Sequence, residues 1–173
     1  MPMTRHARLP IRSAHYQLGV SMLEVLIAVL ILSFGLLGLA GLLSGGMRAN
    51  QSAYYRTVAT NQAYDMTDRM RSNLAGVAAG GYANVTGIPG NPGCDTGPCT
   101  PIQLAQYDAF DWNTTNAATL PRGAGVVCLD SSPDDGTPAA PACDNAGTIY
   151  VTKVWWDDDR TGTLKRFVTS FQP

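Results

Sequence analysis

The side chains best suited to chemistry are few and unevenly distributed along this chain. The sequence has 173 residues with 2 histidines, and both of them, His6 and His15, precede a long apolar run. Imidazole is a common general base and metal ligand, so removal of the N-terminal segment would also remove most catalytic dyads, triads and imidazole metal sites. We therefore expect no catalytic residues, no cofactor and no enzymatic activity.

The 4 cysteines are the next candidates, and all of them follow the apolar run. They are Cys94, Cys99, Cys128 and Cys143. In an exported chain, four cysteines indicate two disulfides, and three pairings are open. We favour Cys94–Cys99 with Cys128–Cys143, because each pair brackets a loop that contains proline. A four-cysteine zinc site is the competing interpretation, but the second pair is too widely spaced for a zinc knuckle, so we expect no metal.

Charged and aromatic residues near the C-terminus permit two further interpretations. The acidic segment 157–159 lacks the pattern of a calcium-binding loop, and we read it, like Asp134 and Asp135, as a solvated turn. The basic residues Lys153, Arg160, Lys165 and Arg166 would form a solvated face. DNA contact is the alternative for this face, but the formal net charge of the chain is −1, and we expect no nucleic-acid partner.

The apolar run before the cysteines indicates on which side of a membrane the rest of the chain lies. Residues 25–43 contain no charged side chain, and a helix of that length just spans the hydrocarbon layer of a bilayer. Residues 1–19 carry three arginines and no acid, which keeps this end in the cytoplasm and exports the remainder. Export followed by cleavage near Gly41 or Ser44 is an alternative, but the run is longer than the core of a secretory signal.

The order of features before the run resembles the signal of a type IV prepilin. A basic leader is followed by Gly19, then Val20-Ser21-Met22-Leu23-Glu24, and then the apolar helix. The resemblance implies that a prepilin peptidase cuts between Gly19 and Val20 and methylates the new amine of Val20. Phenylalanine is usual after the glycine in that family, and Val20 departs from the pattern.

Glu24 is the only ionisable side chain between Tyr16 and Arg48. A charge within a membrane helix is costly, so it should have a partner or a function. The resemblance implies that Glu24 sets the assembly register by pairing with the Val20 amine of a neighbouring subunit. The alternative is a glutamate that extends to the membrane interface without a partner.

The helix is expected to continue well beyond the membrane. No proline occurs between Pro10 and Pro89, so one helix from Ser21 to Leu74 would extend about 80 Å. We divide the chain into a leader (1–19), a transmembrane half of the helix (20–46), an amphipathic half (47–74) and a periplasmic head (75–173). The amphipathic half has one apolar stripe: Ala59, Ala63, Met66, Met70 and Leu74.

The head is predicted to be small and to need the helix for its core. Residues 76–101 are rich in glycine and proline and indicate an irregular loop. Strand patterns occupy 125–129, 148–156 and 163–171, and the last two form an antiparallel hairpin. The buried face of the hairpin is undecided between two sets, Ile149, Val151 and Trp155 or Tyr150, Val154 and Trp156. The fold class is thus α+β, a long helix packed on a small antiparallel sheet.

The helix layout and the Val154-Trp155-Trp156-Asp157 strand look most like the minor pilins of type IV pili. Membership implies a type IV pilin fold, insertion in the inner membrane before assembly and later incorporation in a fibre at the cell surface. The implied partners are the prepilin peptidase, other minor pilins and the major pilin. Loss of residues 1–19 leaves 9 basic and 13 acidic residues, a charge of −4 that suits a periplasmic head. A minor pseudopilin of type II secretion, a DNA-binding pilin and an adhesin share the N-terminal features and stay open.

Overall fold

The computed structural model describes residues 19–173, in two compact units that meet between Ser44 and Gly45. The expectations that concern Arg5, Arg8, Arg12 and the rest of residues 1–18 lie outside the described residues. The first unit contributes the N-terminal part of helix α1 (Met22–Ser72), and the second contains the remainder of α1 and every other element. We describe each unit by itself.

Helix α1 ends two residues earlier than the sequence indicated. Its last residue is Ser72, and Asn73 then caps a second, short helix, α2 (Leu74–Ala78). The Asn73 side chain accepts a hydrogen bond from the Gly76 amide at 3.0 Å, which is the usual role of an N-cap asparagine. The expected apolar stripe is therefore wrong at its last position, because Leu74 is 54% exposed in α2.

The segment expected to be one irregular loop contains regular structure. Besides α2 it holds a three-residue strand, β1 (Asn84–Thr86), whose Val85 is buried. A loop follows β1 and is closed by a disulfide between Cys94 and Cys99. The expectation of a loop is therefore correct only for the part after Thr86.

Helix α3 (Pro101–Thr119) was not anticipated from the sequence. It begins with a capping box, in which the Thr100 hydroxyl accepts from the Gln103 amide and the Gln103 side chain accepts from the Thr100 amide. Pro101 occupies the first turn, where its missing N–H costs nothing. Its buried residues include Ala105, Ala109 and Trp112, at helical spacing.

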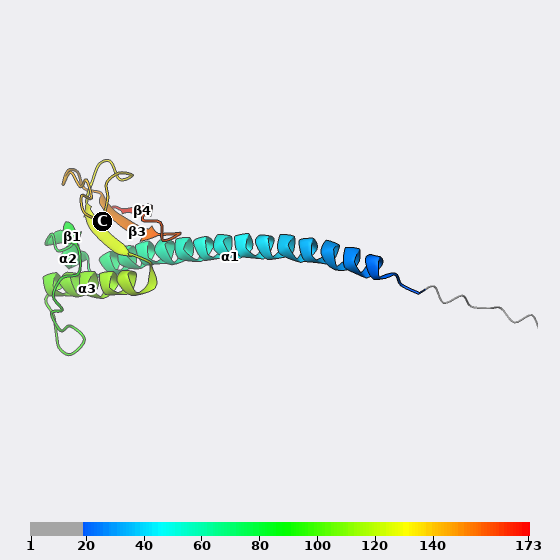
Figure 1. Cartoon of the computed structure of the whole chain (residues 1–173). Helices are drawn as coiled ribbons and strands as arrows, with labels where there is room; N and C mark the ends of the chain where they lie inside the picture. Colours follow the sequence, from blue (N-terminus) through cyan, green and yellow to red (C-terminus); the bar gives the residue numbers. More distant parts are fainter. Residues whose placement is uncertain (1–18) are drawn as a thin grey trace, which may run out of the picture. The chain divides into compact units, whose positions relative to one another are not determined.

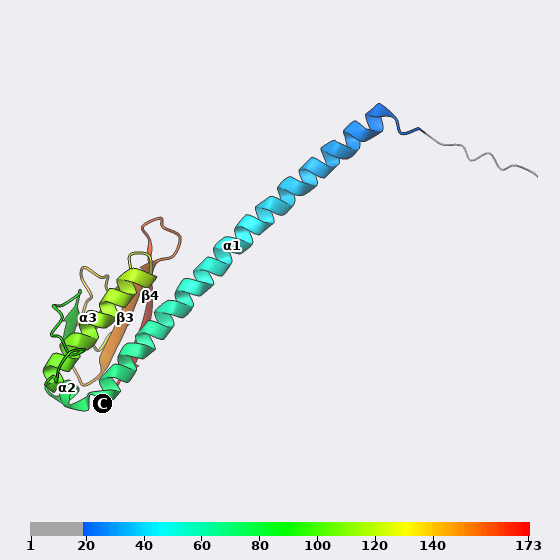
Figure 2. The ribbon, with the colours of Figure 1, turned by 90° about the horizontal axis from the view of Figure 1, so that it is seen from below.

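The four strands form one antiparallel sheet in the order β1-β2-β3-β4. The other three strands are β2 (Ala124–Leu129), β3 (Tyr150–Asp157) and β4 (Leu164–Phe171), close to the predicted ranges. In the hairpin, Val154 lies opposite Phe167 and Tyr150 opposite Phe171. Within the second unit, α3 lies beside the C-terminal part of α1, and the two helices cover one face of the sheet (Figures 1 and 2).

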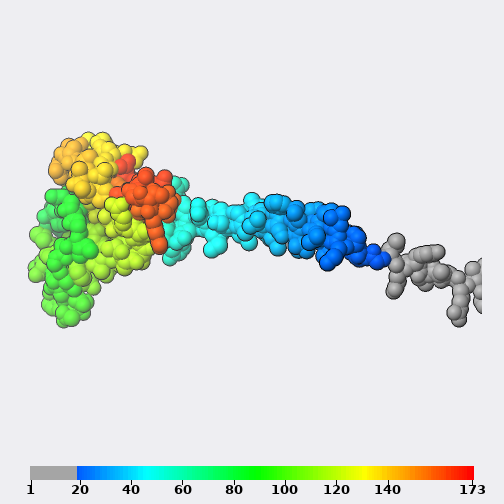
Figure 3. Space-filling view, in the orientation of Figure 1, coloured from blue at the N-terminus to red at the C-terminus, as the bar shows by residue number. Residues whose placement is uncertain are grey.

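Both faces of β3 are buried, whereas each of the two alternatives for the hairpin assumed a single buried face. Tyr150, Val154 and Trp156 join Ala59, Ala63, Met66 and Met70 of α1 in the main core. Val151 and Trp155, on the opposite face, are also buried, while Ile149 is exposed. The second face is covered by residues 130–149, which we call the covering loop and which form an outer surface of the head in Figure 3.

Candidate functional site

The first candidate site is the start of helix α1. Gly19 and Val20 precede the helix, and Val20 is 70% exposed. The Ser21 hydroxyl accepts a hydrogen bond from the Glu24 amide at 3.2 Å, so the serine caps the first turn. Glu24 lies in that turn, where the helix dipole favours a negative charge. The segment thus presents an exposed Gly19–Val20 bond shortly before a helix whose first turn carries a carboxylate.

The part of α1 that follows Glu24 has an apolar surface. All of residues 22–43 are exposed, and the large hydrophobic side chains among them include Leu26, Ile31, Phe34 and Leu42. This N-terminal helix is long and apolar enough to span a membrane. A surface of this kind in water would be far larger than the apolar patches of ordinary monomers. It therefore needs lipid or other apolar helices around it.

The cysteines occur as the two disulfides favoured above. Cys94 and Cys99 have Cα atoms 5.5 Å apart, and those of Cys128 and Cys143 are 6.1 Å apart. Cys128, Asp130 and Cys143 have potential ligand atoms within 4.8 Å of one another. Both sulfur atoms of this trio are bonded to each other, so they do not offer a pair of thiolates to a metal ion.

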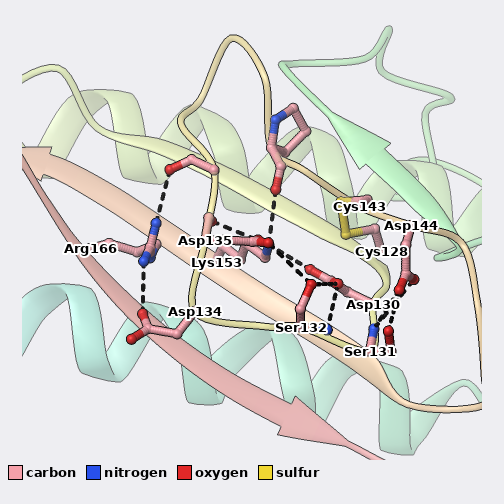
Figure 4. Close-up of polar contacts among 12 residues, drawn as sticks. Cys128, Asp130, Ser131, Ser132, Asp134, Asp135, Cys143, Asp144, Lys153 and Arg166 are labelled. Atoms are coloured by element: carbon pink, nitrogen blue, oxygen red, sulfur yellow. Dashed lines mark hydrogen bonds and ion pairs between the residues drawn. A yellow bond between two sulfur atoms is a disulfide. The ribbon is translucent and has the colours of Figure 1, made fainter.

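The second candidate site is a buried lysine beneath the covering loop (Figure 4). Lys153 comes from β3, and its side chain is 0% exposed. Its Nζ atom lies 2.6 Å from Asp130 Oδ2 and 2.8 Å from Asp135 Oδ1, and it donates to the Pro141 carbonyl at 2.9 Å. The prediction of a solvated basic face is therefore wrong for Lys153.

Asp134 and Asp135 are also more than a solvated turn. Asp135 pairs with Lys153, and this hydrogen bond lowers the pKa of its carboxyl group. Arg166 of β4 contacts Asp134 at 2.8 Å and donates to the Gly136 carbonyl at 2.9 Å. Lys153 and Arg166, two cations of the sheet, thus bind the covering loop, a role that the sequence did not indicate.

The acidic segment 157–159 was expected to be a solvated turn, and this is wrong for Asp157, which ends β3 and is 3% exposed. Asp157 accepts from the Gly162 amide at 3.0 Å, and Asp159 accepts from the Thr161 hydroxyl at 2.7 Å. Asp158 accepts from the Ser52 hydroxyl of α1 at 2.5 Å. Each carboxylate is therefore engaged by a group of the chain itself.

A polar cluster connects α1 to α3 inside the second unit. Arg69 contacts Asp65, Asp108 and Asp111 at 2.8, 3.4 and 2.7 Å. Tyr82 donates its hydroxyl hydrogen to Asp108 at 2.5 Å. Burial raises the pKa of Asp108, although the Tyr82 hydrogen bond and Arg69 oppose this shift. Burial and the bond to Asp108 likewise raise the pKa of Tyr82. The network is a structural connection rather than an open reactive site, because its members are satisfied by one another.

Over residues 19–173 these features define an α+β protein with one N-terminal helix able to span a membrane and a small head built on a four-stranded antiparallel sheet. No family model, no curated protein and no solved structure matches this chain in comparisons with known proteins.

Proposed function

We propose that this chain is a non-catalytic minor pilin of the type IV pilus, similar to PilV. In this proposal the prepilin peptidase removes residues 1–19 and methylates Val20. The mature chain stays in the inner membrane as a single-pass protein with a periplasmic head. It then joins other minor pilins, primes assembly with the major pilin and takes a place at the fibre tip.

The observation that carries the proposal is the division of α1 into two surfaces. Residues 22–43 are exposed and contain Glu24 as their only charged residue. Residues 55–70 of the same helix supply Tyr55, Ala59, Ala63, Met66 and Met70 to the core of the head. One half of the helix thus belongs to a folded head, and the other half requires apolar surroundings. This arrangement suits a subunit that moves from a bilayer to a helical fibre.

Glu24 gives this arrangement a defined register. A carboxylate in an apolar bundle contributes little net stability when paired, but an unpaired one is costly. The amine at Val20 of a neighbouring subunit would satisfy it at one axial position only. Misplaced subunits would leave the charge buried without a partner, so the pair selects a position rather than strengthening the fibre.

Mass spectrometry of the N-terminal peptide tests the proposal directly. The full chain is produced with and without a prepilin peptidase, and the N-terminus is identified in each sample. We expect a chain that begins at methylated Val20 only when the peptidase is present. A product that begins beyond Leu43 would overturn the proposal, because the apolar half of α1 would be missing from the exported protein.

A deletion strain separates the pilus from type II secretion. Loss of surface fibres with intact secretion supports the minor pilin. Loss of secretion with intact fibres would instead assign the chain to the pseudopilins.

A further inference from the structure

The buried ammonium of Lys153 connects the two chain segments that carry one of the disulfides. Asp130 lies two residues after Cys128, and Pro141 lies two residues before Cys143. Lys153 Nζ contacts the carboxylate of the first at 2.6 Å and the carbonyl of the second at 2.9 Å. The same cation therefore contacts both chain segments that lead to the disulfide, each at two residues from a cysteine (Figure 4).

We propose that Lys153 is a positioning residue for the oxidation of Cys128 and Cys143. Its ammonium gathers the covering loop before the disulfide exists and thereby brings the two thiols together. In the oxidation, the two thiols lose two protons and two electrons, and one S–S bond forms. A disulfide-bearing oxidant accepts the electrons and protons, its own S–S bond breaks, and it leaves as two thiols.

The surroundings of Lys153 show why an open loop is disfavoured. The side chains of Lys153 and Asp130 are both 0% exposed, and Asp135, at 43%, contacts the ammonium from the outer side. The Asp135 carbonyl is a fourth oxygen beside the ammonium, at 3.3 Å. A buried charge without partners is strongly unfavourable, so the closed loop is the arrangement that satisfies this cation while the sheet is folded.

The second disulfide of the same chain provides an internal comparison. Cys94 and Cys99 are 5 positions apart in the sequence, and Cys128 and Cys143 are 15 positions apart. The shorter loop brings its thiols together at a smaller cost in chain entropy. None of the ion pairs among residues 19–173 includes a residue between 87 and 100. Lys153 should thus affect one disulfide and leave the other unchanged.

Coupling between the ammonium and the disulfide must be reciprocal. If the contacts of Lys153 favour the S–S bond, then the bond favours those contacts by the same factor. Reduction of Cys128–Cys143 should therefore loosen the covering loop without opening it, because Lys153 still holds both segments. Loss of both restraints should open it.

The test measures the equilibrium of each disulfide in the full chain in detergent. Reduced protein is equilibrated in mixtures of oxidised and reduced glutathione, quenched with acid, alkylated and digested, and each cysteine pair is quantified by mass spectrometry. We expect Lys153→Met to lower the equilibrium constant of Cys128–Cys143 about tenfold, within the usual range of such couplings. The constant of Cys94–Cys99 should stay within about twofold of the wild-type value.

Matched variants make the outcome decisive. Lys165→Met removes an exposed lysine of β4 and should leave both constants unchanged. In concentrated urea the wild type and Lys153→Met should agree, since the effect requires the folded loop. Asp135→Asn removes the partly exposed partner and should give a smaller decrease for Cys128–Cys143.

Three results would overturn the inference. The first is an unchanged Cys128–Cys143 constant in a folded Lys153→Met protein. The second is an equal decrease for both disulfides, which would indicate general loss of the fold. If Lys153→Met does not fold, Asp135→Asn decides, and an unchanged constant in that variant is the third.

Discussion

Gly125 leaves space for the indole of Trp112, and adding a single methyl group there should be costly. Gly125 lies in β2, opposite Val154. A Cβ atom at this position would lie 2.2 and 2.3 Å from two carbons of the six-membered ring of Trp112, and 2.8 Å from Asn116 Nδ2. Carbon atoms normally stay about 3.5–4.0 Å apart, so the ring would have to move by more than about 1 Å.

Trp112 has little freedom to make that movement. It is fully buried, and its Nε1–H donates to the Gln62 carbonyl of α1 at 2.7 Å. Overpacking of a core typically costs about 1–3 kcal/mol, and the fixed ring places Gly125→Ala near the upper end, about 3 kcal/mol. For a domain of this size, each kcal/mol lowers the melting temperature by about 4 °C, so we expect a decrease of about 12 °C.

Calorimetric melting of the full chain in detergent, with a double-mutant cycle, tests this reasoning. Trp112→Phe alone should cost about 2 kcal/mol, from lost packing and from loss of the indole hydrogen bond to the Gln62 carbonyl. Because phenylalanine is smaller than the indole, the double variant should cost about 3 kcal/mol rather than the sum of about 5 kcal/mol. Gly97→Ala, where a Cβ meets nothing within 4 Å, is the control. Additivity to within about 0.5 kcal/mol would refute the proposed clash.

Three other predictions concern assembly and the polar cluster. Glu24→Val should leave leader cleavage intact but reduce the fraction of the chain in sheared fibres, measured by immunoblot against the membrane fraction; equal incorporation would remove the register argument. Tyr82→Phe should lower the free energy of unfolding by about 1–3 kcal/mol in urea titrations, because buried Asp108 loses a donor at 2.5 Å, and a change near zero would contradict this role. Because the pKa of Asp108 is raised in the folded state, protonation of this carboxyl group stabilises that state. The stabilisation is complete below the ordinary pKa of 3.8 and is lost as the pH rises through the raised pKa. The stability of the wild type relative to Asp108→Asn should therefore increase between about pH 7 and about pH 4, and a constant difference would count against the shift.

The sequence predicted the elements that are long or rich in strand-forming residues. Helix α1 and strands β2, β3 and β4 all lie close to their expected ranges, because a long stretch without proline marks the helix and runs of apolar, β-branched and aromatic residues mark the strands. Helix α3 was missed although its start carries a readable signal, Thr100-Pro101 followed by Gln103. Its buried face consists of two alanines, Trp112 and three polar residues (Asp108, Asn113 and Asn116), which gives a weak apolar stripe. Strand β1 is too short to show a period at all.

The candidate sites divide along a similar line. Glu24 could be singled out because it is a charged residue beside a long uncharged run. The four cysteines could be singled out because cysteines in an exported chain indicate disulfides. Lys153 is different, because an alternating strand places it on a face that would be solvated if nothing covered it. The covering loop that buries it has no regular pattern, and its contacts with Asp130, Asp135 and Pro141 depend on tertiary structure. Burial of both faces of β3 was hidden for the same reason.

The three tryptophans give the head a natural set of optical reporters. Trp112 and Trp156 lie in the core shared with the helices, whereas Trp155 lies on the opposite face beside Cys128. No tryptophan occurs before residue 112, so the apolar half of α1 contributes no indole emission. Variants that keep one tryptophan would therefore separate two events by fluorescence alone. Emission from Trp155 would follow the opening of the covering loop, and emission from Trp156 would follow the detachment of α1 from the sheet.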